Sequence, residues 1–158
     1  MPITSTDTAI QPSVVDVRGP RFVAWVTTAV LVVVLLLAAI APAAAAVLIA
    51  VQALVFGLGA ALDPRRHPYG LIYARVVAPR RGPVTDTEPT PPLRFAQLLG
   101  LVFAVLSLLG FLAGSSVVGA LFAGFALFAA FLNAAFGICL GCKIYPLVSR
   151  LSPSPITH

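Results

Sequence analysis

The chain has 158 residues, of which 59% are hydrophobic and 9% are charged, and its mean hydropathy is +1.03. Soluble domains carry about 25% charged residues, so a chain this poor in charge could not cover its surface against water. The composition excludes an ordinary soluble domain and predicts an all-α membrane protein, because helices satisfy their own backbone hydrogen bonds in lipid. All ten lysines and arginines lie outside the longest apolar stretches. We therefore expect the basic residues behind the net charge of +5 to set the orientation of the protein in the membrane, and we predict no nucleic-acid partner.

Residues 1–20 are predicted to form a disordered head that faces the cytoplasm. Two long stretches without charge follow, from Phe22 to Leu62 and from Phe95 to Cys142. A membrane helix needs about 20 residues, so each stretch has room for two. Pro42 divides the first stretch, and Gly114-Ser115-Ser116 divides the second. The prediction is a polytopic bundle of four transmembrane helices in two hairpins, forming one domain over 21–150, with helices at about 22–41, 43–62, 95–113 and 117–141.

The first apolar stretch has one alternative interpretation, a secretory signal peptide cleaved near Ala41-Pro42-Ala43. The apolar core of a signal peptide is about 7–15 residues long, which is shorter than this stretch. The preceding head also contains two aspartates. We therefore favour a helix that is retained in the membrane.

A faint internal duplication relates the two hairpins. Arg21-Phe22 and Arg94-Phe95 each begin the first helix of a hairpin. Phe56-Gly57 and Phe136-Gly137 each lie near the end of the returning helix. Two parallel hairpin repeats would produce this pattern.

The loop over 63–94 is rich in proline and arginine. Its prolines exclude a long regular element, but YGLIYARVVA, between Pro68 and Pro79, is apolar enough for a short helix on the membrane surface. Because basic residues favour the cytoplasmic side of short loops, we predict that the loop, the head and the flexible tail (151–158) face the cytoplasm. The arginines either fix this orientation alone or also bind anionic lipid or a protein partner. The candidate binding residues are Arg65, Arg66, Arg75, Arg80, Arg81 and Lys143.

Small residues recur every three or four positions in the last predicted helix, which favours close helix packing within the bundle or in a homo-oligomer. The predicted membrane interior has no ionisable residue, which argues against a proton-coupled pump. Its polar candidates include Gln52, Gln97 and Asn133. The small residues are Gly119, Ala123, Ala126, Ala130, Ala134, Gly137 and Gly141.

The two cysteines of the chain, Cys139 and Cys142, stand three positions apart at the end of the last predicted helix. This spacing places both on one helix face, and a disulfide between them would need a local distortion that Gly137 and Gly141 favour. A dithiol at the end of a helix disfavours thiolate, whereas one at its beginning favours it. A break at Gly137 would therefore reverse the local electrostatics. Asn133 is predicted to make an interhelical hydrogen bond or, alternatively, to support the dithiol.

Three interpretations of the cysteine pair are open. The favoured one is a redox or sulfur-carrying dithiol, and another is two inert small residues at a helix end. A metal site needs about four ligands, and Cys139, Cys142 and His67 supply three, so no metal is predicted. His67 is most simply a surface residue. The sequence has no phosphate-binding glycine loop and no paired carboxylates, and no cofactor is predicted.

Several segments resemble a bacterial membrane family known as domain of unknown function 4395. The resemblance implies a four-helix inner-membrane protein with a terminal C-x-x-C, here Cys139 and Cys142. It also implies, through the gene neighbourhood of relatives, an association with thioredoxin-like proteins and thiosulfate-type sulfurtransferases. The segments are VDVRGPRFVAW, RRHPYGLIYARVVAPRRGP, PLRFAQLLG and FLNAAFGICLGCKIY.

Together these observations predict a thiol-redox or sulfur-handling membrane protein. Its dithiol would exchange disulfides, or hold a persulfide, with a thioredoxin-like or sulfurtransferase partner at the cytoplasmic face. The alternatives are a non-catalytic subunit or scaffold of a membrane complex and a small oligomeric channel.

Overall fold

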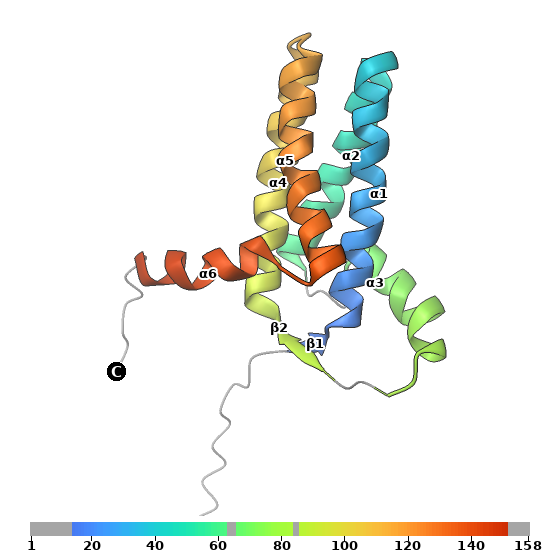
Figure 1. Ribbon diagram of the computed structural model, residues 1–158, viewed down its shortest axis with the longest axis vertical. Coiled ribbons are helices and arrows are strands. Elements are labelled where there is room, and N and C mark those ends of the chain that lie inside the picture. Colours follow the sequence, from blue (N-terminus) through green and yellow to red (C-terminus); the bar gives the residue numbers. More distant parts are fainter. Residues whose placement is uncertain (1–13, 63–65, 84–85, 152–158) are drawn as a thin grey trace, which may run out of the picture.

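The computed structural model describes residues 14–62, 66–83 and 86–151. Four of its helices are long and apolar enough to cross a membrane (Figure 1). This confirms the predicted membrane bundle of four long helices, to which the structure adds two three-residue strands. In chain order the elements are β1 (Val14–Asp16), α1 (Arg18–Ile40), α2 (Pro42–Ala61), α3 (Pro68–Ile72), the π-helical η2 (Tyr73–Val77), the 3₁₀-helical η3 (Ala78–Arg80), β2 (Thr87–Pro89), α4 (Thr90–Leu112), α5 (Ser116–Phe136) and α6 (Leu140–Leu151).

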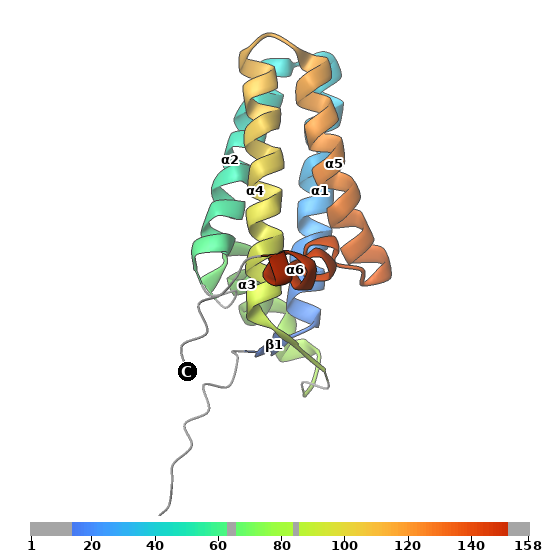
Figure 2. The same ribbon diagram turned by 90° about the vertical axis from the view of Figure 1, so that its left-hand side faces the viewer.

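The four long helices form a ring in which α1 and α4 each pack against both α2 and α5. The two hairpin turns lie together at one end of the ring, and the strands, α3 and α6 lie towards the other (Figures 1 and 2). Both turns form where the sequence predicts. Pro42 takes the first position of α2, where its missing N–H costs nothing. Gly114 ends α4 with φ 83°, and the amide of Ser115 donates to the carbonyl of Gly110 at 2.9 Å.

Some predicted boundaries are wrong. The helix α1 begins at Arg18 instead of residue 22, and Val14–Asp16 form a strand within the predicted disordered head of 1–20. The helix α4 begins at Thr90 instead of residue 95, because its first turn accommodates Pro91 and Pro92. Residues 1–13 and 152–158, in the predicted head and tail, lie outside the described residues.

The two hairpins are preceded by equivalent strands, which pair with each other antiparallel, Val15 opposite Glu88. The helix ends also correspond in part. Arg94, at the start of α4, donates to the carbonyls of Ala60 and Ala61 at the end of α2, at 3.0 and 3.1 Å. Its counterpart Arg21 lies beside the end of α5, with its guanidinium carbon 3.9 Å from the position of a Cβ on Gly137. These contacts support the hairpin repeat, although the Phe-Gly pairs do not correspond, since Gly57 lies inside α2 and Gly137 follows α5.

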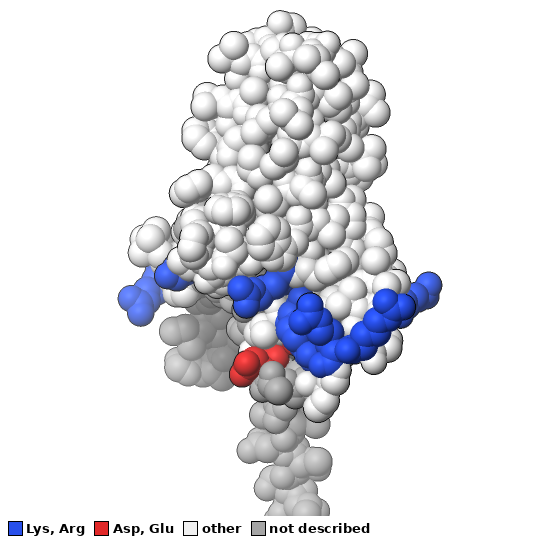
Figure 3. Space-filling view, turned by 45° about the vertical axis from the view of Figure 1, so that its right-hand side comes forward, with Lys and Arg blue, Asp and Glu red and all other residues white. Residues whose placement is uncertain are grey.

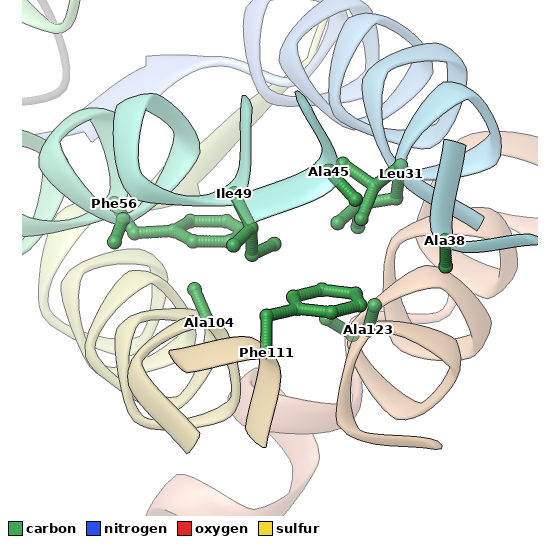
Figure 4. Close-up of a cluster of buried hydrophobic side chains, with 11 residues drawn as sticks. Leu31, Ala38, Ala45, Ile49, Phe56, Ala104, Phe111 and Ala123 are labelled. Carbon is green, nitrogen blue, oxygen red and sulfur yellow. The ribbon is translucent and has the colours of Figure 1, made fainter. Parts of the chain in front are cut away.

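The half of the ring nearest the hairpin turns contains the packed core. Leu31, Ile49 and Phe111 point towards one another between the four helices (Figure 4). A Cβ on Gly110 would lie 2.6 Å from the backbone nitrogen of Gly119, so α4 and α5 meet there through their backbones. The predicted role of small residues in packing is thus supported within the chain. Buried members of the predicted stripe are Gly119, Ala123, Ala126 and Ala134.

The outer surface of the ring is apolar, and many of its exposed side chains are large hydrophobic ones, among them Leu36, Leu54, Leu112 and Phe128. Lysine and arginine side chains gather at the end opposite the hairpin turns, below a wide uncharged surface (Figure 3). This distribution is typical of a multi-pass membrane protein whose basic end lies in water.

Candidate dithiol site and membrane cavity

Helix α5 ends at Phe136 because Gly137 adopts the left-handed conformation, with φ 67°. Its amide and that of Ile138 donate to the carbonyls of Asn133 and Leu132, at 3.1 and 3.2 Å. Glycine takes this conformation without the steric cost that a Cβ would add. The predicted continuous helix over 117–141 is therefore wrong. The chain turns here, and α6 runs sideways from the bundle (Figure 1).

Cys139 stands directly before α6. Its carbonyl accepts the first helical hydrogen bond, from the amide of Lys143 at 3.0 Å, and Cys142 lies in the first turn. The cysteine pair thus begins a helix instead of ending one. The positive end of the helix dipole favours a thiolate at this position, which is the reverse of what a continuous helix would do.

The side chain of Cys139 is half-buried, and its sulfur is disulfide-bonded. The sequence contains one other cysteine, Cys142, whose side chain lies outside the described part of the chain. The structure thus presents Cys139 in an oxidised form at the start of α6.

Helix α6 carries an apolar stripe at the spacing of one helix face, formed by Ile144, Leu147, Val148 and Leu151, all exposed. The ring of Tyr145 contacts that of Phe95 in α4, with centroids 5.9 Å apart. A helix of this kind, attached to the basic end of a membrane bundle, suits the interface between lipid and water.

A cavity of about 600 Å³ occupies the half of the ring nearest the basic end. Phe56 and Ala126 belong both to its wall and to the packed core, and Cys139 and Asn133 form part of its wall. Its other polar side chains include Thr27, His67 and Gln97. Cys139 and Asn133 thus line one cavity together with Gln97 from α4 and His67 from the segment before α3. The predicted role of Asn133, in an interhelical hydrogen bond or beside the dithiol, stays a prediction.

His67 is buried, with 3% of its surface exposed, so the predicted surface position is wrong. It caps α3, its Nδ1 accepting from the amide of Tyr69 at 3.3 Å, while its Nε2 has the Gln97 side chain as a neighbour but no partner of regular hydrogen-bond geometry among the described atoms. Burial lowers the pKa of His67 to about 4, and the neighbouring Gln97 side chain opposes that lowering in part. The ring is therefore neutral at pH 7, and because Nδ1 accepts, Nε2 carries the proton.

A hydrogen bond between Tyr69 and Gln52 ties this segment to α2. The tyrosine hydroxyl donates to Gln52 Oε1 at 3.0 Å, and Gln52 is 1% exposed, which confirms its predicted burial. Burial raises the pKa of Tyr69. The bond holds α3, and with it His67, against the bundle.

Asp16 joins the central loop to the start of α1. It forms an ion pair with Arg18 at 2.9 Å and accepts from the hydroxyl of Tyr73 at 3.3 Å. Burial acts to raise the pKa of Asp16, but hydrogen bonds and the charge of Arg18 outweigh it and hold the pKa below its usual value. Arg18 also donates to the carbonyl of Arg81 at 2.9 Å. These contacts place the 68–80 segment beside the cavity.

The predicted basic residues that the structure describes do not line the cavity. Arg65 lies outside the described residues, and the others are exposed. Within the described ranges no three His, Cys, Asp or Glu residues are grouped to hold a metal ion. The burial of His67 was not predicted, and its place before Pro68, at a helix start, was the available signal. The exposed basic residues are Arg66, Arg75, Arg80, Arg81 and Lys143.

Comparison with known proteins identifies the family to which the chain belongs. Residues 15–150 match the model of a family described as "Domain of unknown function (DUF4395)". No curated protein and no solved structure matches the chain. The matched range covers most of the chain, including both hairpins and all of α6 except its last residue.

Proposed function

The chain belongs to the DUF4395 family, and we propose that it uses Cys139 and Cys142 as a dithiol–disulfide couple for a thioredoxin-like or sulfurtransferase partner. The observation that carries this proposal is the helix break at Gly137, which gives Cys139 the first position before α6. A thiolate is stabilised at that position by the helix dipole. The disulfide-bonded state of Cys139 is the oxidised form that such a couple requires.

The exchange would proceed through a mixed disulfide. The thiolate of Cys139 attacks one sulfur of a partner disulfide, which releases the other partner sulfur as a thiolate. Cys142 then attacks Cys139 in the mixed disulfide, releasing the reduced partner and leaving a Cys139–Cys142 disulfide. The reverse sequence oxidises a partner dithiol. A sulfurtransferase would instead transfer its sulfane sulfur to the attacking thiolate, which would then hold a persulfide.

The basic end of the molecule is suited to bring such a partner to the dithiol. Exposed cations, including Arg66, Arg80 and Lys143, belong to the segment between α2 and α4 and to α6, which lie at the end of the bundle where α6 begins (Figure 1). Such a cluster attracts an acidic partner surface and raises the association rate. By the rule that basic residues face the cytoplasm, we place this end in the bacterial cytoplasm, where thiols are kept reduced. The disulfide would then be a transient state of the reaction.

A trapping experiment tests the proposal. In Cys142→Ser, the thiolate of Cys139 has no second cysteine to resolve the mixed disulfide, so a thioredoxin-like or sulfurtransferase protein should remain attached to it. Non-reducing gels and mass spectrometry of the captured protein detect the complex, and Cys139→Ser with Cys142→Ser is the control. Absence of such a protein from the Cys142→Ser sample would count against the proposal.

A further inference from the structure

We propose that the cavity beside Cys139 binds a membrane quinone, which accepts two electrons from the Cys139–Cys142 dithiol. The inference rests on the proposed function of the two cysteines and adds the redox partner of the same site. It is argued from the lining of the cavity, from two buried polar atoms and from the chemistry of the dithiol.

The lining of the cavity selects an uncharged, mainly apolar ligand. Alanine and aromatic side chains such as Ala130 and Phe103 form much of its wall. Among the lining residues that the structure describes, Asp16 is the one charged side chain, and it is paired with Arg18. An anion such as a fatty acid or a sulfur oxyanion would meet no basic lining residue there. The volume of about 600 Å³ is in the usual range for small-molecule sites.

Two buried polar atoms in this wall match the oxygens of a quinone. His67 Nε2 is a hydrogen-bond donor and Gln97 Oε1 an acceptor, and the two side chains interact with each other, but neither atom has a partner of regular hydrogen-bond geometry among the described atoms. Both side chains line the cavity and approach the same point beside Gly59. Buried polar groups without partners cost free energy. A quinone carbonyl would accept from His67, and a hydroquinone hydroxyl would also donate to Gln97, so both redox forms find partners.

The reaction balances without a further reagent. Two S–H bonds of the dithiol break, and an S–S bond forms between Cys139 and Cys142. The two electrons and two protons pass to the quinone, whose two carbonyl oxygens become hydroxyl groups. Cys139 belongs to the wall of the same cavity, so the quinone and the residue that loses electrons share one cavity. The disulfide so formed then oxidises the dithiol of the soluble partner.

Decylubiquinone tests this inference on the purified full chain in detergent. The reduced protein is mixed with the quinone without oxygen, and free thiols and quinone absorbance are followed together. We expect the loss of both thiols with consumption of one quinone per chain. Ala130→Leu, which fills the cavity, should slow the reaction at least tenfold, and His67→Phe should raise the half-saturating quinone concentration about tenfold. Ala39→Leu, which adds the same side chain at an exposed site of α1, should react like wild type.

A second measurement does not depend on how the cavity variants fold. In Cys142→Ser, bound decylubiquinone should slow the labelling of Cys139 by a maleimide, and an equal concentration of a saturated alkane amphiphile should not. Equal labelling rates with and without quinone, or no oxidation of wild type by quinone, would overturn the inference. If quinone neither oxidises the wild-type dithiol nor slows the labelling of Cys139, while Cys142→Ser still captures its partner, the cavity proposal is wrong and the proposed function stands. If neither occurs, both are wrong.

Discussion

The Cδ2 atom of His67 lies 2.6 Å from the position that a Cβ atom on Gly59 would occupy. The Cγ and Cδ atoms of Gln97 lie 2.9 Å from the same position. The last turn of α2 therefore leaves a space that the imidazole ring and the amide side chain fill together. The geometry of the cavity wall depends on a residue that has no side chain.

Gly59→Ala should displace His67 or Gln97 and destabilise the fold. Introducing a methyl group into a packed site costs about 1–3 kcal/mol, so the free energy of unfolding in detergent should fall by that amount. Gly124→Ala is the matched control, since a Cβ there meets no atom within 4 Å. Equal thermal stability of the two variants would show that the packing at Gly59 is not as close as the structure has it.

Gly137→Ala should weaken the dithiol site. The left-handed conformation at φ 67° costs an alanine about 1–2 kcal/mol, and continuing α5 relieves that cost but removes Cys139 from the start of α6. The stabilisation of the thiolate by the helix dipole is then lost, so the rate at which iodoacetamide alkylates Cys139 of the reduced protein at pH 7 should fall. Gly114→Ala carries the same backbone cost, at φ 83°, in the distant hairpin turn, and its alkylation rate should match wild type. A fall of equal size in both variants would argue against the role of the helix break.

The long helices could be predicted from sequence because lipid imposes one requirement on every residue of a span. The turns at Pro42 and Gly114 followed from local chemistry that needs no tertiary contact. The end of α5 could not be predicted in this way. The small residues continue at helical spacing through Gly137, so the sequence does not show whether this glycine continues the helix or ends it. Ile144 and Leu147 share the exposed apolar face of α6, but no helix was predicted from their spacing.

The candidate site was predictable only where its residues are close in sequence. Asn133 and Cys139 lie within two turns of each other, and both line the cavity. His67 reaches the same cavity because Gly59 and Gln97 leave space for its ring. That arrangement depends on how α2 packs against α4, which helical periodicity does not determine.

Tyr69→Phe should loosen the segment that carries His67. The variant loses the hydroxyl that donates to buried Gln52, and a buried acceptor left without its donor costs about 1–3 kcal/mol. Thermal unfolding in detergent should show the loss, and hydrogen exchange should increase over residues 67–77. Tyr145→Phe is the control, because the Tyr145 hydroxyl makes no hydrogen bond with the described residues. Similar effects of the two variants would contradict the anchoring role of Tyr69.

The stability of the protein should fall between pH 6.5 and pH 4 because of His67. The folded-state pKa of about 4 lies below the ordinary value of 6.5, so in this window the unfolded chain binds the proton more readily. The stabilising effect of a neutral His67 is therefore complete above pH 6.5 and is lost progressively on acidification, by about 2 kcal/mol at pH 5. Asp16 does not contribute in this window, since its lowered pKa keeps it ionised.

Chemical unfolding in detergent at pH 7.5 and at pH 5 measures this difference. His67→Gln keeps a polar side chain at the site but cannot gain a proton, so the difference between the two pH values should shrink by the same 2 kcal/mol or so. Arg66→Gln, at the exposed neighbouring position, should retain the wild-type difference. An unchanged pH dependence in His67→Gln would show that the imidazole is accessible to water in the folded protein.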